Sequence, residues 1–527
     1  MCMTDPIQIG SLLIHLWICD MKKQLIYFAP ICLFLFPACE PDLPGGGGTG
    51  PVIEAPKKPP YQPNIIFFLI DDIGLISTPP YSSVNPTDTV WQLDNNNYWD
   101  PKLPKAVYST DTIFQFAQQA TRLNQMYATP SCAPSRAQLL TGLYPCNTGI
   151  TFPAWGDTTP ATPQVPNGYL DTTILTYANQ LQDLGYTTGF GGKYNLRYGL
   201  TEGSTYTLAD SNAYNLAVYN QQQHLIGHGF DETFGPSTWD RNGYYTGGKA
   251  LIGNTVDYFP PFLDGFFPDT LHQWAMEFVQ KHESGSDPYY LHYCFGMIHD
   301  YNLYAELKLK DPAITQAEVF AMKVHLVDSM IKEVLALVDP DSTLVIIAGD
   351  NGTESFKSSF GPGYATAYHG TGIPGGKLTM ESHGSRVPFM LSWPGVIKTN
   401  NDYDEMVDFA DVFGTMVELA GGQDTFPSLN GNSFLYQISN DSLGTDYTPR
   451  KYVYSQLQGQ GFVASIDTLM LVDNVYNPQT VSWYDISSSP YQDQFLDSTS
   501  VDSCQGNPMW SYFEELGTIG LCEKSCP

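Results

Sequence analysis

The sequence predicts an α/β fold, with one large domain and a smaller one in a chain of 527 residues. The first observation is that short, apolar runs rich in β-branched and aromatic residues alternate with segments of helical periodicity. The second is that several of these runs end directly in acidic or other polar residues. Buried parallel strands have this continuous apolar character, and their carboxyl ends line one edge of a sheet. We therefore expect a sheet covered by helices, with a functional site along that edge.

Four runs are expected to be buried strands. Each is short and apolar and is bounded by turn residues or by charges, which favours a strand over a buried helix. These runs are residues 64–70, 186–190, 289–295 and 342–348.

Three segments have the 3.6-residue periodicity of amphipathic helices. They are residues 111–126, 173–184 and 317–338. Gly185 follows the second of them, as expected at the end of a helix. Residues 76–104, in contrast, are polar and rich in Pro, Asn and Tyr, and we expect them to form a surface insertion.

The chain is strongly acidic, with 24 basic and 54 acidic residues and a net charge of −30. This balance argues against nucleic acid as a partner, because nucleic-acid binding needs a basic surface. An anionic substrate would also be repelled at long range. A local cluster of the scarce Lys and Arg residues would then have to bind it.

The N-terminus predicts an exported, membrane-anchored protein. Residues 1–38 are expected to be a leader. Within them, the basic pair Lys22-Lys23 is followed by a short apolar core, residues 25–36, which is typical of an export signal. The leader ends at Cys39, whose surroundings favour a bacterial lipobox with Cys39 as the lipidated residue; a plain signal peptide cut near Ala38 is the alternative. Residues 39–62 are rich in Gly and Pro and are expected to form a flexible tether. We expect a periplasmic or cell-surface lipoprotein that meets the membrane only through this anchor.

The ten cysteines do not indicate a disulfide framework in a chain of this length. Cys146 and Cys294 are expected to be buried and free. Cys504, Cys522 and Cys526 lie close together at the C-terminus, where one pair could form a disulfide outside the cytosol. The sequence does not say which pair.

The run from Cys132 to Gly142, CAPSRAQLLTG, is the most informative motif of the chain. Pro134 suits the first position of a helix, which would place Cys132 just before a helix N-terminus. Free N–H groups and the helix dipole favour an anion there. Arg136 adds a fixed positive group within one helical turn.

This run resembles the sulfatase signature C-x-P-S-R-x-x-L-L-T-G. The resemblance implies that a maturation enzyme oxidises Cys132 to formylglycine, whose hydrated aldehyde is the nucleophile, while Arg136 holds the hydrate. It further implies an alkaline-phosphatase-like fold: a large mixed, mostly parallel sheet sandwiched by helices, with a small C-terminal α+β subdomain. The matches extend from about Pro63 to Leu496. On this basis residues 63–430 are assigned to the catalytic domain and residues 431–527 to the subdomain.

Two further motifs are similar to the metal-binding segments of sulfatases. Asp71-Asp72 follows the first expected strand, and Asp350-Asn351 follows the last. Three carboxylates and one amide oxygen form a hard oxygen set that suits Ca²⁺, or Mg²⁺, better than zinc. The resemblance adds residue 132 to this set, because the metal binds the formylglycine as well as a sulfate oxygen.

The segment GKYNL, residues 192–196, stands where sulfatases usually have GKWHL. Lys193 matches a lysine that contacts the substrate. Asn195 replaces a histidine that bonds the formylglycine and helps it to release sulfate. An amide can donate or accept a hydrogen bond in the substrate site, but it cannot shuttle a proton. The loss of such a group commonly lowers the rate by about 10²–10⁴-fold.

Three more residues are assigned by the resemblance. His299 follows the strand at 289–295 and matches the histidine that protonates or polarises the leaving oxygen. Lys377 matches a lysine that clamps the sulfate. His383 stands where sulfatases commonly have glycine, and could line the substrate pocket and partly compensate for Asn195. The segment Trp483 to Ile486 resembles the terminal strand of the subdomain.

We therefore predict a sulfuric ester hydrolase acting on a sulfated carbohydrate or a related sulfate ester. A phosphonate or phosphodiester hydrolase is an alternative, because relatives with the same signature cleave those substrates. A glycan-binding lipoprotein with impaired catalysis is another, because of Asn195. The substrate itself, its sulfated position and the oligomeric state are not predicted.

Overall fold

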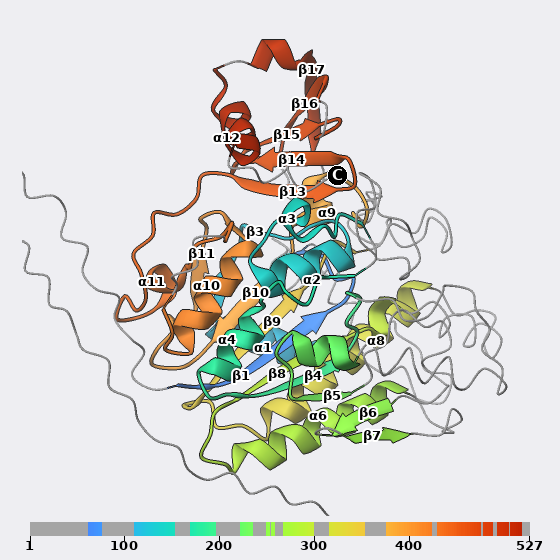
Figure 1. The fold of residues 1–527 in the computed structure, drawn as a ribbon, viewed down its shortest axis with the longest axis vertical. Coiled ribbons are helices and arrows are strands. Elements are labelled where there is room, and N and C mark those ends of the chain that lie inside the picture. The colour runs from blue at the N-terminus through green and yellow to red at the C-terminus, as the bar shows by residue number, and fades with distance from the viewer. Residues whose placement is uncertain are drawn as a thin grey trace, which may run out of the picture. The chain divides into compact units, whose positions relative to one another are not determined.

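Four parallel strands form the centre of a ten-stranded sheet (Figure 1). Their order is β9-β1-β8-β4, and each neighbouring pair is parallel, so that their carboxyl ends meet at one edge. They are β1 (Asn64–Ile70), β4 (Thr187–Gly192), β8 (Tyr289–Phe295) and β9 (Thr343–Gly349). All four predicted strands are confirmed, two of them with a shift of one or two residues.

The structure is a computed structural model. It describes residues 62–75, 110–152, 169–196, 222–234, 249–252, 255–258, 267–299, 316–353, 376–423, 429–475, 478–487, 493–504 and 506–518. The predicted leader, Cys39, the tether up to residue 61, the insertion at 76–104, Cys522 and Cys526 lie outside the described residues.

Shorter strands extend the central sheet on both sides, and most of the pairs that they form are antiparallel. They are β2 (Thr121–Leu123), β10 (Phe389–Ser392), β11 (Asn401–Tyr403), β5 (Glu232–Phe234), β6 (Lys249–Ile252) and β7 (Thr255–Tyr258). A separate pair joins β3 (Met126–Tyr127) to β12 (Val407–Asp408) in parallel.

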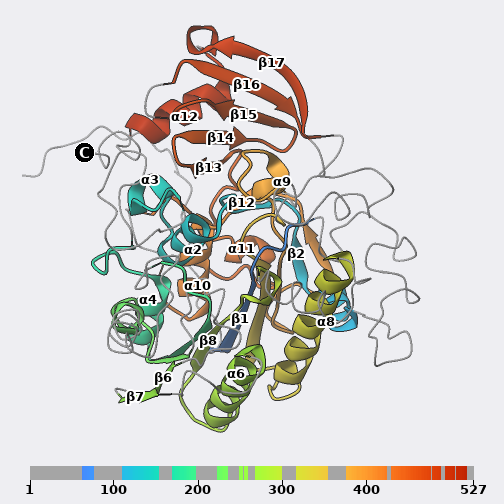
Figure 2. The same cartoon turned by 90° about the vertical axis from the view of Figure 1, so that its right-hand side faces the viewer.

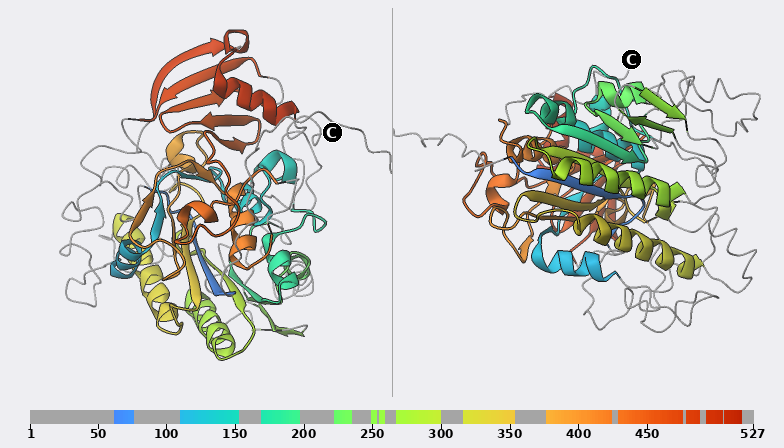
Figure 3. Two further views of the ribbon diagram at one scale, coloured as in Figure 1. Left: turned by 90° about the vertical axis from the view of Figure 1, so that its left-hand side faces the viewer. Right: turned by 90° about the horizontal axis from the view of Figure 1, so that it is seen from below.

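Helices cover both faces of the sheet (Figure 3). Alternate residues of β1 face opposite sides, so Phe67 enters one apolar core and Phe68 the other. The core around Phe68 is completed by α1 (Asp111–Gln119), α6 (Phe267–Glu283) and α8 (Gln316–Leu335). The core around Phe67 is completed by α2 (Cys132–Thr141), α4 (Tyr177–Asp183) and α10 (Ala410–Leu419). The predicted mixed, mostly parallel sheet between helices is confirmed.

The predicted boundaries of all three helices are wrong at one end or both. The helix expected to reach Val338 ends at Leu335. The helix expected over 111–126 ends at Gln119, because Ala120 is extended and the chain enters β2, which pairs with β10 and β11. Its apolar periodicity therefore continues into a strand. The helix expected from Thr173 begins at Tyr177, where Thr176 and Asn179 form a capping box.

The C-terminal part contains a second, antiparallel sheet of five strands (Figure 2). Its strands are β13 (Val453–Leu457), β14 (Gln460–Ala464), β15 (Thr468–Val472), β16 (Thr480–Asp485) and β17 (Gln494–Ser500). Helix α12 (Pro508–Thr518) packs on it through Trp510 and Phe513. The segment around Trp483 lies in β16, so the expectation that it is the terminal strand is wrong: β17 follows it.

The remaining short elements connect these layers. They are α3 (Pro145–Thr148), the 3₁₀ turn η3 (Met297–His299), α9 (Ser382–Ser385), α11 (Leu435–Ile438) and the 3₁₀ turn η4 (Val501–Cys504). Cys294 and Cys504 are buried thiols, and Cys146 is buried as well. Among the described residues, no helix has the length and apolar character needed to cross a bilayer.

We predict that Gly192→Ala at the end of β4 destabilises the protein strongly. Gly192 has a φ of +96°, and an added Cβ would lie 2.0 Å from the carbonyl oxygen of Cys294. Left-handed strain and the clash together should lower the free energy of unfolding by about 3 kcal/mol. Urea unfolding measures the change.

Gly185→Ala is the matched control. Gly185 has a φ of +91°, but no atom would lie within 4 Å of the added Cβ. Only the strain remains, and we expect a loss of about 1 kcal/mol. Equal losses for the two variants would show that the close approach to Cys294 does not constrain β4.

Candidate active site

Three buried carboxylates meet where β1 and β9 end. Asp71 and Asp72 directly follow β1, and Asp350 directly follows β9. One carboxylate oxygen from each lies within 4.8 Å of the other two. The backbone N–H of Asp72 also donates to Asp350 Oδ1 at 3.0 Å. The parallel pairing of β1 with β9 therefore brings together residues that are 278 positions apart.

Three cationic side chains surround these carboxylates. Arg136 donates to Asp350 Oδ2 through Nε at 3.0 Å and Nη2 at 2.8 Å. Lys193 Nζ lies 2.5 Å from Asp71 Oδ2, and Lys377 Nζ lies 2.7 Å from Asp72 Oδ2. The structure thus brings together the predicted acidic and basic residues, all of them buried.

Cys132 is the first residue of α2, and its thiol is buried. Pro134 stands at the third helical position and not at the first, as the sequence suggested; its missing N–H is harmless there because N–H groups of the first turn have no intrahelical partner. Asn195 Nδ2 donates to Cys132 Sγ at 3.0 Å. The amide of Asn195 therefore contacts the residue predicted as the nucleophile.

Two polar residues of the site have a left-handed backbone. The φ of Asp72 is 57° and that of Asn195 is 59°. Asp and Asn tolerate this region better than most residues, and such conformations concentrate at functional sites. Asn195 lies three residues after the end of β4, and its side chain reaches the first residue of α2.

The charges of the cluster shift its pKa values in opposite directions. Burial alone would raise the pKa of Asp71, but the nearby positive charges, led by Lys193, hold it below its usual range. Burial and the charge of Asp71 raise the pKa of Asp350 to about 7. Burial also raises the pKa of the Cys132 thiol, which outweighs the effect of the nearby lysines. An unmodified Cys132 is therefore a thiol and not a thiolate at neutral pH.

The oxygen atoms of this cluster suit a hard divalent cation. Three carboxylates converge, and the Oδ1 atom of Asn351 is buried without a hydrogen-bond partner, while its Nδ2 donates to Asp72 Oδ1 at 2.8 Å. A buried acceptor without a donor is unfavourable unless it binds something else. A cation bound by these four residues would satisfy the oxygen and would favour ionised carboxylates.

The two predicted histidines differ in position. His299 lies on η3 after β8, with Nε2 3.8 Å from Asp72 Oδ2. Burial, followed by the charges of Lys193 and Lys377, lowers its pKa well below the usual value. His383 is buried on α9, with Nδ1 3.4 Å from Glu381 Oε2. Among the described contacts, none joins His383 to Cys132 or Asn195.

Ser135 is a site residue to which sequence reasoning gave no role. Its hydroxyl donates to the carbonyl oxygen of Asp350 at 2.5 Å and accepts from the N–H of Thr129 at 3.1 Å. It thereby fixes α2 to the end of β9. Its place inside the CAPSRAQLLTG run was the only signal in the sequence.

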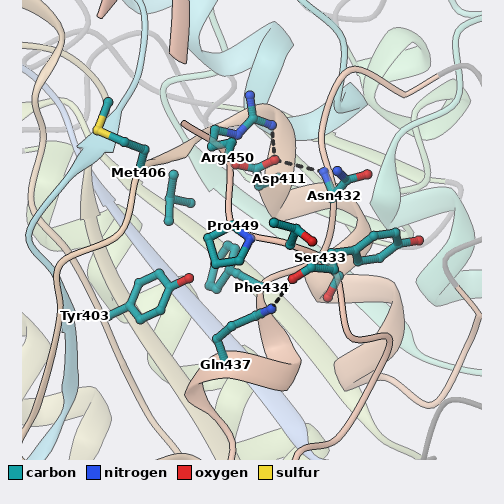
Figure 4. Close-up of a pocket in the computed structure, with 12 residues that line it drawn as sticks. Tyr403, Met406, Asp411, Asn432, Ser433, Phe434, Gln437, Pro449 and Arg450 are labelled. Atoms are coloured by element: carbon teal, nitrogen blue, oxygen red, sulfur yellow. Dashed lines mark hydrogen bonds and ion pairs between the residues drawn. The ribbon is translucent and has the colours of Figure 1, made fainter. Parts of the chain in front are cut away.

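A separate small pocket contains none of the predicted site residues (Figure 4). Tyr403, Phe434 and Pro449 form part of its wall. Its charged groups are already paired, because Arg450 binds both Asp408 and Asp411. We regard these contacts as structural.

A match to one protein family covers the central part of the chain. Residues 86–422 match the model of the Sulfatase family, which is more than half of the chain. The chain belongs to the sulfatase family. The matched range begins after Asp71 and Asp72, whose place in the site therefore depends on the structure.

Two bacterial sulfatases are among the relatives. An N-acetylgalactosamine-6-O-sulfatase of Bacteroides thetaiotaomicron is 23% identical over 75% of this chain and 79% of its own length. An ulvan-active sulfatase of Formosa agariphila is 23% identical over 85% of this chain and 71% of its own length. This sulfatase is thus an enzyme of the sulfuric ester hydrolase class, as predicted.

Solved structures share the fold. Ps i-CgsB in complex with k-i-k-neocarrahexaose has a TM-score of 0.59 at 17% identity, over 89% of this chain and 94% of its own. PsFucS1 sulfatase from Pseudoalteromonas sp. has a TM-score of 0.59 at 18% identity, over 89% and 91% of the two chains. At this identity the likeness concerns the fold alone. The sulfatase has the predicted alkaline-phosphatase-like architecture.

Proposed function

We propose that this sulfatase removes sulfate from a sulfated carbohydrate, with formylglycine derived from Cys132 as the nucleophile and a divalent cation beside it. The observation that carries the proposal is the position of Cys132. It begins α2 beside a buried cluster of three carboxylates and three cationic side chains, and its pKa responds to both kinds of charge. Formylglycine formation would replace a thiol that stays protonated at neutral pH.

Asp71, Asp72, Asp350 and Asn351 would hold the cation, Ca²⁺ or Mg²⁺, together with residue 132. The cation would supply positive charge against the sulfate oxygens and against the nucleophile. The three converging carboxylates and the buried Oδ1 atom of Asn351, which has no hydrogen-bond partner, support the assignment.

The basic residues would bind the charge of the transferring group. Lys193 and Lys377 point their Nζ atoms at the carboxylate cluster, where the sulfate would lie against the cation. Arg136 is held by Asp350 and by the carbonyl oxygen of Lys193, 2.5 Å from Nη1, so its guanidinium is fixed near residue 132. Fixed charges directed at the transition state are usually the largest catalytic term.

His299 is proposed to serve the leaving oxygen. Its lowered pKa means that the imidazole is neutral at pH 7, and a neutral imidazole can still donate one N–H hydrogen bond. His383 is proposed as part of the wall of the substrate pocket. Its described side-chain contact is with Glu381, two residues before it in the chain.

Replacing Asn195 by histidine should raise kcat by up to about 10²-fold or leave it unchanged. The reason is that histidine can transfer a proton where the amide only donates to residue 132, at 3.0 Å in the unmodified thiol. Histidine also tolerates the left-handed backbone of this position.

Steady-state kinetics with a sulfate ester measure the change in kcat. Asn195→Ala is the control: it removes the hydrogen bond to residue 132 and is expected to lower kcat. A large loss for Asn195→His would show that the pocket is built around the amide.

A glycan is proposed as the substrate because two relatives are named for carbohydrate sulfates and a structural neighbour is seen with an oligosaccharide. The test is sulfate release, measured by ion chromatography, from a panel of sulfated glycans and from nitrophenyl sulfate. Turnover of at least one glycan above the aryl ester supports the proposal. An intact glycan panel beside rapid turnover of the aryl ester would contradict it.

We also propose that the protein is exported and anchored through a lipid on Cys39, with Ala38 ending the leader. The basic start and apolar core of the leader support this. Labelling of wild-type and Cys39→Ala protein with a radioactive fatty acid in a bacterial host tests it, because only the wild-type protein should carry the label.

A further inference from the structure

The segment from Lys377 to Arg386 connects the C-terminal sheet with the active site. Lys377 begins it and binds Asp72, while α9 lies near its end. Backbone hydrogen bonds fix the segment on two sides. Lys377 N–H donates to the carbonyl of Thr353, and Leu378 N–H donates at 2.7 Å to the carbonyl of Pro130, two residues before Cys132.

The conformation of this segment is not one that its own residues favour. Leu378 has a φ of 64°, and its side chain is 48% exposed. A leucine rarely adopts the left-handed region, and such strain persists only where surrounding contacts impose it. The position of Lys377 therefore depends on partners outside the segment.

One of these partners lies directly before the last strand of the C-terminal sheet. Asp493, the residue before β17, is 9% exposed and accepts from the N–H of Ser382 at 2.6 Å through Oδ2. Its second oxygen, Oδ1, accepts from the Ser382 hydroxyl. Ser382 is fully buried, so water does not replace either bond. Both oxygens of one carboxylate thus hold one residue of α9.

Strand β13 supports the same place. Ser455 on β13 donates to the carbonyl of Ala128 at 3.2 Å, and its hydroxyl lies 3.4 Å from that of Ser385. Ala128 N–H in turn donates to the carbonyl of Ser385 at 2.8 Å. Figures 1 and 2 both draw α9 beside β13. The C-terminal sheet therefore contacts both the segment that carries Lys377 and the chain that leads to Cys132.

We propose that Asp493 is a positioning residue for the active site. It touches none of the reacting groups, and acts by holding Ser382 so that Lys377 is directed at the sulfate. The C-terminal sheet is then part of the catalytic apparatus and not only an appended domain. This inference rests on the proposed role of Lys377 in binding sulfate.

The test compares Asp493→Ala with wild type, in the mature full-length enzyme. We expect kcat/KM to fall by about 10–100-fold, as is typical when a residue that orients a catalytic or ligand side chain through a hydrogen bond is removed. The inhibition constant for inorganic sulfate should rise, while the melting temperature changes little.

Asp493→Asn should retain activity within about 3-fold, because the Ser382 hydroxyl can accept a hydrogen bond from the amide. Asp485→Ala is the control: Asp485 is a half-buried acidic residue of β16 whose side chain bonds only to Ser487 among its described contacts, and activity should be unchanged.

A double-mutant cycle separates positioning from a general effect on the fold. If Asp493 acts through Lys377, adding Asp493→Ala to Lys377→Ala should lower kcat/KM by less than about 3-fold further. Independent, multiplying losses would overturn the proposal. A Lys377→Ala variant with full activity would instead overturn the proposed function of Lys377 and would leave the role of Asp493 to be judged separately.

If Asp493→Ala does not fold, Ser382→Ala takes its place in the same cycle. It removes only the hydrogen bond of the hydroxyl, and by itself it should lower kcat/KM by about 3–10-fold.

Discussion

Replacing Cys132 by alanine should abolish sulfate ester hydrolysis, leaving less than about 10⁻³ of the wild-type kcat. The proposed nucleophile is made from this side chain, and the surrounding lysines and Arg136 bind charge but carry no group that could take its place. The fold should survive, because alanine is a good helix former and Cys132 is the first residue of α2. Activity on a nitrophenyl sulfate and on the best glycan of the panel measures the loss.

Cys504→Ala is the matched control for this variant. Cys504 is likewise a buried thiol, but it packs in the core between the C-terminal sheet and α12. It should lose some stability and keep its kcat. A Cys132→Ala protein with a tenth of the wild-type rate would contradict the proposed nucleophile.

Replacing Asp350 by asparagine should damage both catalysis and stability. We expect kcat/KM to fall by at least about 10³-fold, since one ligand of the proposed cation is weakened and its charge is removed. The free energy of unfolding should fall by about 3 kcal/mol, because Arg136 would stay buried without its closest negative partner. Metal content by mass spectrometry, steady-state kinetics and urea unfolding give the three values. The bound Ca²⁺ or Mg²⁺ should drop below one ion per chain.

The ion pair of Arg122 with Asp402 provides the contrast. Its N–O distance is 2.7 Å, as short as those in the site, but the side chain of Asp402 is 51% exposed. Asp402→Asn should change the free energy of unfolding by no more than about 1 kcal/mol and leave kcat/KM unchanged. Equal effects of the two substitutions on stability would show that burial does not set the strength of the Arg136 pair.

Much of the central fold could be predicted because its strands are buried on both faces. The run at β1 is apolar from Ile65 to Ile70 and ends at Asp71, and the run at β8 is apolar or aromatic apart from His292 and lies between Pro288 and Gly296. The ends of helices were harder to predict. The apolar periodicity of α1 continues into β2, where pairing with neighbouring strands, and not local preference, determines the backbone conformation. β17 was missed because its residues are mostly exposed and polar, which gives no hydrophobic signal.

The site could be predicted in its members but not in its pairings. Resemblance to sulfatase motifs indicated Asp71, Asp350 and Lys193. The expectation that they lie close together came from their places after strands whose carboxyl ends meet at one edge. Three contacts of the site join residues that are far apart in sequence. They are the ion pair of Lys377 with Asp72, the hydrogen bond from Asn195 to Cys132 and the hydrogen bond from Ser382 to Asp493. Such contacts depend on the packed chain. The sequence therefore contains no local pattern for them.

The most direct test of the account is the mass of the tryptic peptide Leu123–Arg136, which contains Cys132. The protein should be made in a host with the formylglycine-generating enzyme, beside a control sulfatase. The account predicts a peptide about 18 Da lighter than the thiol form, whereas ordinary thiol oxidation would make it heavier. A peptide with only the unmodified thiol, while the control sulfatase is converted, would contradict a formylglycine nucleophile and would favour a glycan-binding protein with impaired catalysis.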